Sequence, residues 1–245
     1  MKEPSRKIVV MTGASGGIGK ALALRFSEEG VSLHLIGRNR GSLELLGVPP
    51  SPPSSSMHYY QSDLTKDKDL IALEETLKTN LDHIDVLIHC AGALILGRME
   101  NSLVNDLDEQ YRINVRAPYA LTKALLPLMK SSKGQIVFIN SSIWQQARAG
   151  ISQYASTKYA LKAIADSVRD EVNADGIRVL SVYLGRTATP MQEVVHNKEG
   201  LSYHPEYLIQ PDDVATIVFN ILTLPRTSEV TDIHIRPMKK APVGR

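Results

Sequence analysis

The sequence predicts an α/β protein, in which a parallel β-sheet of about seven strands carries helices on both faces. Two observations predict this class. Seven short apolar runs, typical of buried strands, recur along the 245 residues, and stretches with helical spacing separate most of them. A glycine-rich turn joins the first apolar run to the first helical stretch. Ligands of such sheets bind at the carboxyl ends of the strands, so we expect the chemistry there.

The elements follow from the apolar pattern in chain order. The expected strands cover residues 7–12, 31–36, 58–61, 84–90, 135–140, 178–184 and 232–236. The expected helices cover residues 17–29, 43–46, 66–79, 103–130, 152–174 and 211–224. The Pro- and Ser-rich segment 49–56 is expected to be an exposed loop. Because no linker or internal repeat divides the chain, we expect a single domain over residues 1–245.

The glycine-rich turn is the first functional signal. Ile18, Leu22 and Phe26 recur every four residues, which is the spacing of one helix face. A helix N-terminus offers unpaired N–H groups, and a glycine brings no Cβ between the backbone and a phosphate, so the turn predicts a pyrophosphate-binding site. Its pattern is not G-x-G-x-x-G but G-x3-G-x-G, over Gly13, Gly17 and Gly19.

Composition excludes several classes of protein. The 28 basic and 26 acidic residues give a net charge of +2 without a long block of one sign, so no nucleic-acid partner is expected. Cys90 is the only cysteine, which excludes an internal disulfide and favours a reducing compartment, with the cytoplasm as the expected location. No apolar run reaches the length of a membrane span, and the scattered histidines predict no metal site.

A second signal lies in the expected helix 152–174. Tyr154 and Lys158 are four residues apart, so their side chains project from one face. An ammonium group beside a phenol favours the phenolate. A free tyrosine titrates near pH 10, so ionisation at neutral pH requires roughly 4 kcal/mol from nearby cations. Such a pair alone is also compatible with a solvated helix surface.

Together the two signals resemble the motifs of the short-chain dehydrogenase/reductase family, in its single-domain branch. TGASGGIG at Thr12–Gly19 is similar to the family's TGxxxGxG cofactor loop, and YASTK at Tyr154–Lys158 to its YxxxK pair. The resemblance runs from about Lys7 to Met191. It implies a Rossmann-like, doubly wound sheet and an NAD(P)-dependent oxidoreductase that interconverts a carbonyl and an alcohol by hydride transfer. Tyr154 would be the general acid/base, helped by Lys158 and an oxidised nicotinamide.

The resemblance also implies the other site residues. Ser141 stands thirteen residues before the tyrosine (154 − 141 = 13), with Ser142 as the alternative, and Asn114 completes a tetrad by holding a proton-relaying water. The implied catalytic residues are Ser141, Tyr154, Lys158 and Asn114. The implied cofactor-binding residues are Gly13, Ser15, Gly17, Ile18, Gly19, Arg38, Asp63, Leu64, Ala91, Gly92, Tyr154, Lys158, Gly185, Thr187 and Thr189. Two positions depart from the family pattern: HCAG, with His89 and Cys90, replaces NNAG, and Leu184 replaces a proline.

The second expected strand indicates which cofactor is used. Residues 31–40 contain no Asp or Glu, the residues that bind a free ribose 2′-hydroxyl in NAD enzymes. Arg38 follows Gly37 there, and its guanidinium can bind a 2′-phosphate bidentately. The prediction is therefore NADP(H), with NAD(H) as the alternative.

The substrate region and the assembly are predicted more coarsely. Residues 186–207 are expected to form a mobile lid, Arg148, Arg186 and Gln145 to reach a polar or anionic small-molecule substrate unless they are plain surface residues, and Trp144 to line the pocket. The resemblance implies a homodimer or homotetramer. Two other functions stay open: a catalytically idle NADPH sensor, and a nucleotide-sugar epimerase or dehydratase, although such enzymes are usually longer.

Overall fold

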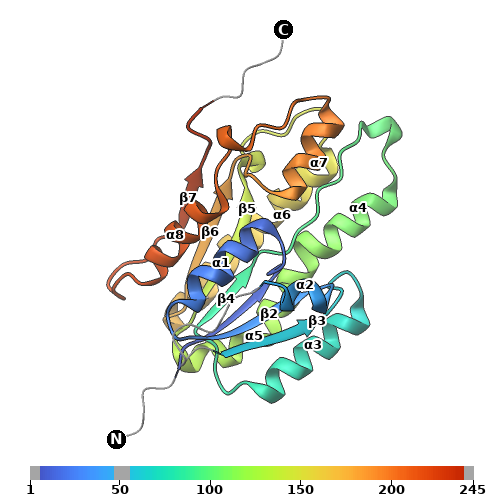
Figure 1. Ribbon diagram of the computed structural model, residues 1–245. Coiled ribbons are helices and arrows are strands. Elements are labelled where there is room, and N and C mark those ends of the chain that lie inside the picture. The colour runs from blue at the N-terminus through green and yellow to red at the C-terminus, as the bar shows by residue number, and fades with distance from the viewer. Residues whose placement is uncertain (1–5, 47–55, 240–245) are drawn as a thin grey trace, which may run out of the picture.

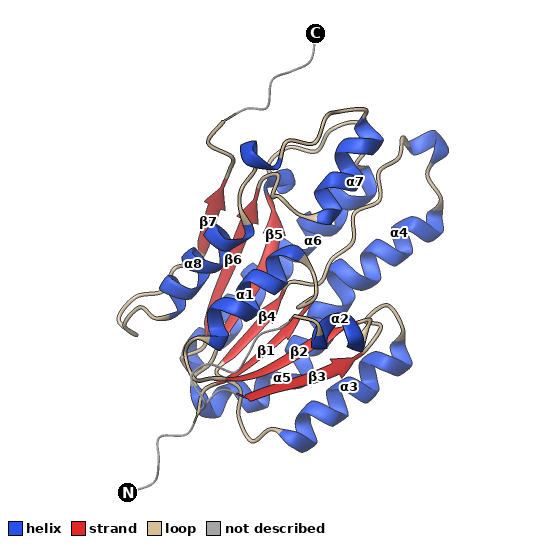
Figure 2. Ribbon diagram, viewed as in Figure 1, coloured by secondary structure: helices blue, strands red, loops and turns tan. Residues whose placement is uncertain are grey.

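A seven-stranded parallel sheet forms the centre of the protein (Figures 1 and 2). The computed structural model describes residues 6–46 and 56–239. The strands are β1 (Ile8–Thr12), β2 (Ser32–Gly37), β3 (Ser56–Gln61), β4 (Val86–His89), β5 (Gln135–Ser141), β6 (Arg178–Leu184) and β7 (Asp232–Ile235). Their order in the sheet is β3-β2-β1-β4-β5-β6-β7, and every neighbouring pair is parallel. The predicted doubly wound sheet of seven strands is confirmed.

Helices cover both faces of this sheet. They are α1 (Gly17–Ser27), α2 (Arg40–Glu44), α3 (Asp67–Asn80), α4 (Val104–Tyr111), α5 (Ala117–Ser132), α6 (Ser152–Val172), α7 (Pro190–Glu199) and α8 (Pro211–Leu222). In Figure 1, α1 and α8 lie in front of the sheet, whereas α5 and α6 lie behind it. None of the helices in the two described ranges is long and apolar enough to cross a lipid bilayer.

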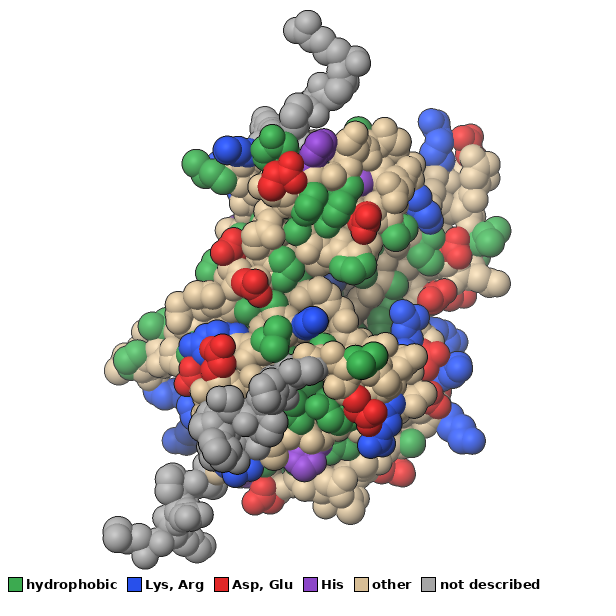
Figure 3. All heavy atoms as spheres, in the orientation of Figure 1, with side chains coloured by type: hydrophobic (Ala, Val, Ile, Leu, Met, Phe, Trp, Pro, Cys, Tyr) green, Lys and Arg blue, Asp and Glu red, His purple; other side chains and the backbone are tan. Residues whose placement is uncertain are grey.

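Each face of the sheet has its own apolar core. On one face α1 and α8 pack together, and the rings of Phe26 and Phe219 meet edge to face with centroids 5.4 Å apart. On the other face Leu77 of α3, Leu125 of α5 and Leu161 of α6 pack against the strands. Because both faces are covered, β2 and β4 are buried on both sides. On the face seen in Figure 3, acidic and basic side chains are interspersed.

The strand order reverses its direction of growth at β1. Thr12, the last residue of β1, pairs with Ile36 of β2 on one side and with His89 of β4 on the other. The chain leaves β1 toward β2 and β3, then crosses over to β4. The connections after β1 and β4 therefore diverge, and open α/β sheets place their ligand crevice at this point.

The structure differs from the predicted elements in four segments. The expected helix 103–130 is two helices, α4 and α5, joined by a π-helical turn at Arg112–Arg116. The expected lid loop 186–207 contains α7, which is capped by the Thr189 hydroxyl at its start and by Gly200 with a φ of 68° at its end. The short second helix begins at Arg40. Of the expected loop 49–56, only Ser56 lies within the described residues, and it begins β3.

Candidate active site

One continuous cleft runs along the carboxyl ends of the strands. Its two cavities share the residues at their junction, which are Ile18, Cys90, Gly92, Ala93, Thr189 and Met191. We call the part lined by the turn 13–19 and the end of β2 the glycine half. We call the part lined by Ser141, Tyr154 and Lys158 the tyrosine half. The cleft thus joins the two regions that the sequence singled out.

The glycine half owes its shape to missing Cβ atoms. Gly13 has a φ of +69°, and a Cβ there would lie 2.6 Å from the backbone nitrogen of Ala91. A Cβ on Gly17 would lie 2.7 Å from Cγ2 of Thr189, and one on Gly19 would collide with the carbonyl oxygen of Gly13. No side chain in the described ranges caps the N-terminus of α1. Its first N–H groups therefore offer an anion site beside a bare backbone.

Arg38 stands exposed at the outer end of the glycine half. It follows Gly37, the last residue of β2, and lines the cavity opposite Ser62, Leu64 and Thr65. Within residues 6–46 and 56–239 no carboxylate pairs with Arg38, in contrast to Arg40, whose Nε lies 2.7 Å from Glu44. Arg38 is thus a cation of the cleft whose charge is not neutralised by a neighbour.

Asp63 is the predicted cofactor residue that lies apart from the lining. Its carboxylate accepts hydrogen bonds from the backbone N–H and the hydroxyl of Thr65, at 3.1 and 2.7 Å, and pairs with Lys66 at 3.4 Å. The side chain therefore fixes the turn before α3, and its neighbours Ser62, Leu64 and Thr65 face the cavity instead. The predicted adenine contact of Asp63 stays a prediction.

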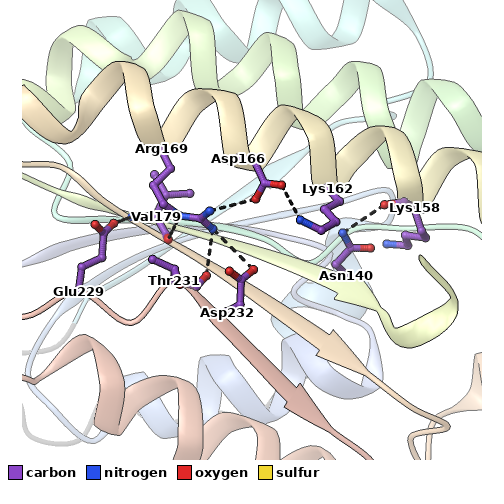
Figure 4. Close-up of polar contacts among 9 residues, drawn as sticks. All are labelled: Asn140, Lys158, Lys162, Asp166, Arg169, Val179, Glu229, Thr231 and Asp232. Carbon is purple, nitrogen blue, oxygen red and sulfur yellow. Dashed lines mark hydrogen bonds and ion pairs between the residues drawn. The ribbon is translucent and has the colours of Figure 1, made fainter. Parts of the chain in front are cut away.

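The reacting side chains of the tyrosine half come from two elements. Tyr154 and Lys158 come from one face of α6, and Ser141 from the end of β5. Nζ of Lys158 lies 5.7 Å from the centre of the Tyr154 ring and donates a hydrogen bond to the carbonyl of Ile139 at 3.2 Å. Nδ2 of Asn140 donates to the carbonyl of Lys158 at 3.3 Å, which ties β5 to α6 at this point (Figure 4).

Burial sets the protonation of this pair. Loss of hydration raises the pKa of Tyr154 to about 12, although a hydrogen bond with Ser141 acts in the opposite direction. Loss of hydration also lowers the pKa of Lys158 to about 8, against the effect of the nearby Cys90 thiol. Lys158 alone therefore does not bring Tyr154 toward the phenolate, and at neutral pH the phenol keeps its proton beside a largely charged ammonium group.

Asn114 fixes the backbone of Ala93, one of the residues at the junction of the two halves. Its amide accepts a hydrogen bond from the backbone N–H of Ala93 at 2.9 Å, and it donates to the carbonyl of Ala93 at 2.8 Å and to Oγ1 of Thr157 at 3.0 Å. It lies in the π-helical turn, a distortion that often marks functional positions. Asn114 therefore joins the segment after β4 to α6, whereas its proton-relay role stays a prediction.

The cleft brings together most of the predicted residues. The lining of the glycine half includes Gly13, Ser15, Gly17, Ile18, Gly19, Arg38, Leu64, Ala91 and Gly92. The lining of the tyrosine half includes Ser141, Tyr154, Lys158, Gly185, Thr187 and Thr189, and also the alternative serine, Ser142. Of the two serines, Ser141 is the one that forms a hydrogen bond with the Tyr154 hydroxyl.

Trp144 does not line the cleft, so that prediction is wrong. Its ring packs 5.3 Å from the ring of Tyr183, and Nζ of Lys162 lies 4.9 Å from its centre. Lys162 belongs to a row of ion pairs along α6, in which Asp166 also pairs with Arg169 at 2.9 Å (Figure 4). The tryptophan therefore belongs to the packing beside the site. Gln145 is also outside the cavity lining.

The sequence analysis missed the contribution of α7. Gln192, Val195 and Glu199 of this helix line the tyrosine half. They were not predicted because the region was expected to be a loop. The available signal was local: a threonine followed by a proline at the helix start and a glycine just past its end. The described residues contain no group of three His, Cys, Asp or Glu side chains that could hold a metal ion.

The comparisons with known proteins agree with this geometry. The family model described as short chain dehydrogenase matches residues 7–200. An uncharacterized oxidoreductase of Staphylococcus epidermidis is 28% identical over 239 residues, which are 97% of this chain and all of that protein.

Solved structures share the fold. A short-chain dehydrogenase from Shigella flexneri, complexed with NADP, is 26% identical with a TM-score of 0.84, covering 93% of this chain and 96% of that one. An alcohol dehydrogenase from the archaeon Thermococcus sibiricus, complexed with 5-hydroxy-NADP, has a TM-score of 0.86 at 24% identity, covering 97% of this chain and 99% of that one. The second likeness concerns the fold alone.

Proposed function

The chain belongs to the short-chain dehydrogenase family of oxidoreductases, and on that premise we propose that it interconverts a carbonyl and an alcohol with NADP(H). In this proposal Tyr154 is the general acid/base. The observation that carries it is the convergence of Tyr154, Ser141 and Lys158 on one cleft that continues into the glycine half.

The glycine half fits a dinucleotide diphosphate. Cβ atoms on Gly13, Gly17 or Gly19 would collide with neighbouring protein atoms, so only glycines allow the turn to pack this closely beside the N-terminus of α1, which offers its N–H groups to an anion. We propose that Arg38, which is exposed and lines the cavity, binds a ribose 2′-phosphate, and this role favours NADP(H) over NAD(H). The NADP complex of the Shigella flexneri relative supports the same choice.

The other implied residues follow the cleft toward Tyr154. Leu64 lines the wall at the adenine end, and Asp63 is proposed there from the family pattern. Gly185, Thr187 and Thr189 would bind the nicotinamide end, and Lys158 the adjacent ribose. The full proposed set is Gly13, Ser15, Gly17, Ile18, Gly19, Arg38, Asp63, Leu64, Ala91, Gly92, Tyr154, Lys158, Gly185, Thr187 and Thr189.

The protein's own groups handle the proton. When bound, a reduced nicotinamide supplies a hydride to the carbonyl carbon. The Tyr154 hydroxyl keeps its proton at neutral pH because its pKa is raised to about 12, so it is ready to donate that proton to the carbonyl oxygen. Ser141 donates a hydrogen bond to the same oxygen as negative charge develops. The ammonium group of Lys158 stabilises the phenolate that is left behind.

The proposal is tested by turnover. The purified protein is mixed with NADPH and a panel of aldehydes, diketones and keto acids, and oxidation of NADPH is followed by its absorbance. Tyr154→Phe is expected to lower kcat by about two to four orders of magnitude, the range for a lost general acid. Tyr59→Phe is the matched control, since Tyr59 belongs to β3 at the edge of the sheet and lines neither half of the cleft.

Two results contradict the proposal. Full turnover by folded Tyr154→Phe would exclude its role as the acid. A silent panel with intact NADPH binding would favour a catalytically idle sensor, although a sensor has no use for the assembled Ser141, Tyr154 and Lys158.

We also propose an assembly and a location for the chain. Large apolar side chains stand exposed on α4, α5 and α6, including Val104 at 72%, Tyr119 at 53% and Tyr159 at 43% exposure. A homodimer or homotetramer that buries these helices is proposed, and sedimentation tests it. We further propose that the protein works in the cytoplasm and that residues 186–207, with α7, close over the substrate as a lid.

A further inference from the structure

Three charged side chains gather on the wall of the tyrosine half. Arg186 comes from the turn after β6, Glu199 from the last turn of α7, and Arg148 from the segment before α6. Nη2 of Arg186 lies 2.5 Å from one carboxylate oxygen of Glu199, and Nη2 of Arg148 lies 3.6 Å from the other. The family pattern quoted above for the glycine turn and the catalytic residues includes none of these three residues.

The charges of this cluster do not balance. Two guanidinium groups share a single carboxylate, and no other acidic side chain in the described ranges pairs with either arginine. One positive charge is therefore left over. The side chain of Glu199 is only 23% exposed and that of Arg186 28%, so solvent screens this part of the wall incompletely.

Arg186 is held firmly, which leaves Arg148 as the adaptable partner. Nη1 of Arg186 lies 3.2 Å from Nε2 of buried His196, and because a guanidinium only donates, Nε2 is the acceptor. Nδ1 then carries the hydrogen and donates it to the carbonyl of Gln192 at 2.8 Å, the shorter of its two contacts with Gln192. Arg186 thus has two acceptors, whereas the side chain of Arg148 is 57% exposed and, among the described residues, makes only the longer contact with Glu199.

Most of the other side chains that line the tyrosine half are apolar. They include Leu94, Leu96, Ile143, Ile151, Met191 and Val195, and the polar members of the same lining include Ser142, Thr187 and Gln192. A bound molecule that reaches from Tyr154 to the arginines therefore meets mainly apolar side chains as well as the positive charge.

We propose that the tyrosine half selects carbonyl substrates that carry a carboxylate separated from the carbonyl by an apolar segment, with Arg148 as the residue that recognises the carboxylate. This inference rests on the proposed function. A monoanion would balance the one excess charge, whereas a doubly charged phosphate would leave an excess negative charge. A carboxylate also matches the planar guanidinium fork.

The reaction on such a substrate leaves the carboxylate untouched. The carbonyl carbon gains the hydride of NADPH, and the carbonyl oxygen gains the proton of Tyr154, which is replaced from solvent. The products are a hydroxy acid and NADP⁺. Arg148 therefore acts on binding rather than on proton transfer, and its effect is expected mainly in KM.

The kinetic test compares oxo acids of increasing chain length with their methyl esters. The wild type is expected to prefer the acid, and Arg148→Met to raise KM for the acid about tenfold, the size of one lost charge-assisted hydrogen bond, with little change for the ester. Arg148→Lys is expected to restore part of the preference. Arg226→Met is the control for the lost charge, because Arg226 donates to Gly176 at the opposite end of the sheet.

Glu199→Gln is expected to change KM for the oxo acid in the opposite direction from Arg148→Met. The substitution removes the carboxylate that competes with the substrate, so KM for the oxo acid is expected to fall while KM for the ester stays the same. A purely structural role of the cluster predicts instead that Glu199→Gln and Arg148→Met impair acid and ester alike. That outcome would overturn the proposal.

Calorimetry tests the same subsite without turnover. Hexanoate and hexanamide, which carry no reducible ketone or aldehyde, are titrated into the protein in the presence of NADP⁺. Hexanoate is expected to bind more tightly, and Arg148→Met to weaken hexanoate about tenfold without affecting hexanamide. Equal binding of the two ligands, or equal hexanoate binding by wild type and Arg148→Met, would overturn the anionic subsite. A silent carbonyl panel would instead overturn the proposed function, so the two failures are distinguishable.

Discussion

The two halves of the cleft are built in different ways. The glycine half is built around the backbone of residues 13–19, where three glycines pack closer to their neighbours than a Cβ would allow, and its lining is completed by the segments after β2, β3 and β4. The tyrosine half consists of side chains from β5, α6 and α7, and burial changes their protonation. The first half therefore depends on the close packing of its turn, and it carries a charged group, Arg38, at its outer end. The second half depends on buried side chains that donate hydrogen bonds and carry charge, so its variants are expected to alter chemistry more than folding.

The largest expected effect separates chemistry from binding in the tyrosine half. Lys158→Met keeps an unbranched apolar stem at this buried position and removes the ammonium group near the Tyr154 ring. We expect kcat to fall about 10²- to 10⁴-fold, as for a lost group in proton transfer. Binding of 2′,5′-ADP, which resembles only the adenosine end of NADPH, is expected to stay within about twofold because that end lies in the other half.

Lys162→Met is the matched control for this prediction. Lys162 lies one helical turn further along α6, pairs with Asp166 at 2.5 Å and is not part of the cavity lining. Its turnover is expected to equal that of the wild type. If Lys158→Met weakened 2′,5′-ADP as much as it lowered kcat, the division of the cleft into two halves would be wrong.

The next effect tests the backbone shape of the glycine half. Gly13 and Gly200 have nearly equal φ values, +69° and +68°, but a Cβ on Gly13 meets the backbone at Ala91, whereas one on Gly200 has nothing within 4 Å. Gly200→Ala is expected to cost about 1–2 kcal/mol in the free energy of unfolding, from the left-handed conformation alone. Gly13→Ala is expected to cost about 1–3 kcal/mol more because of the collision. Urea unfolding measures both, and equal losses would show that the turn has room for a Cβ.

The features that the sequence could predict are those encoded by residues close together in the chain. The turn at 13–19 and the pair Tyr154 and Lys158 are each encoded within a few neighbouring residues, so motif spacing placed them correctly. The strands were predicted to within about two residues at their ends, because covering both faces of the sheet produces bounded apolar runs.

Long-range contacts decided what the sequence could not predict. The helix carrying Asn114 changes to a π-helical turn there, where its amide bonds to both backbone groups of Ala93. Helix α7 has no regular apolar stripe and was predicted as a loop. The pairing of Glu199 with Arg148 and Arg186 depends on three segments meeting in space, which no spacing reveals.

A smaller effect is expected at the outer end of the glycine half. Arg38→Ala removes the cation proposed to bind the 2′-phosphate, so the ratio of kcat/KM for NADPH to that for NADH is expected to fall about tenfold, the size of one charge-assisted hydrogen bond. Arg40→Ala is the control, since Arg40 is two residues away and already paired with Glu44. An unchanged ratio in Arg38→Ala would remove the argument for NADPH from this position.

The smallest effect concerns His89, the last residue of β4, which directly precedes Cys90 at the junction of the two halves. Its side chain is 4% exposed, its Nε2 lies 2.8 Å from Oγ1 of Thr122, and its ring stacks 5.0 Å from that of Phe138. Burial lowers the pKa of His89 to about 3. Between about pH 6.5 and 3 the unfolded chain therefore binds a proton that the folded protein does not, so stability falls as the pH falls through this range.

His89→Asn removes this titration and is expected to flatten the loss of stability on acidification. For one proton the slope cannot exceed about 1.4 kcal/mol per pH unit, and between about pH 7 and 6 only part of that is reached. His34, whose pKa burial lowers to about 4, acts in the same direction, so the slope should be reduced and not abolished. Urea midpoints at several pH values measure it, with exposed His204→Asn as the control. If the two variants gave the same slope as the wild type, His89 would have to accept its proton in place, and the junction would be more hydrated than its packing indicates.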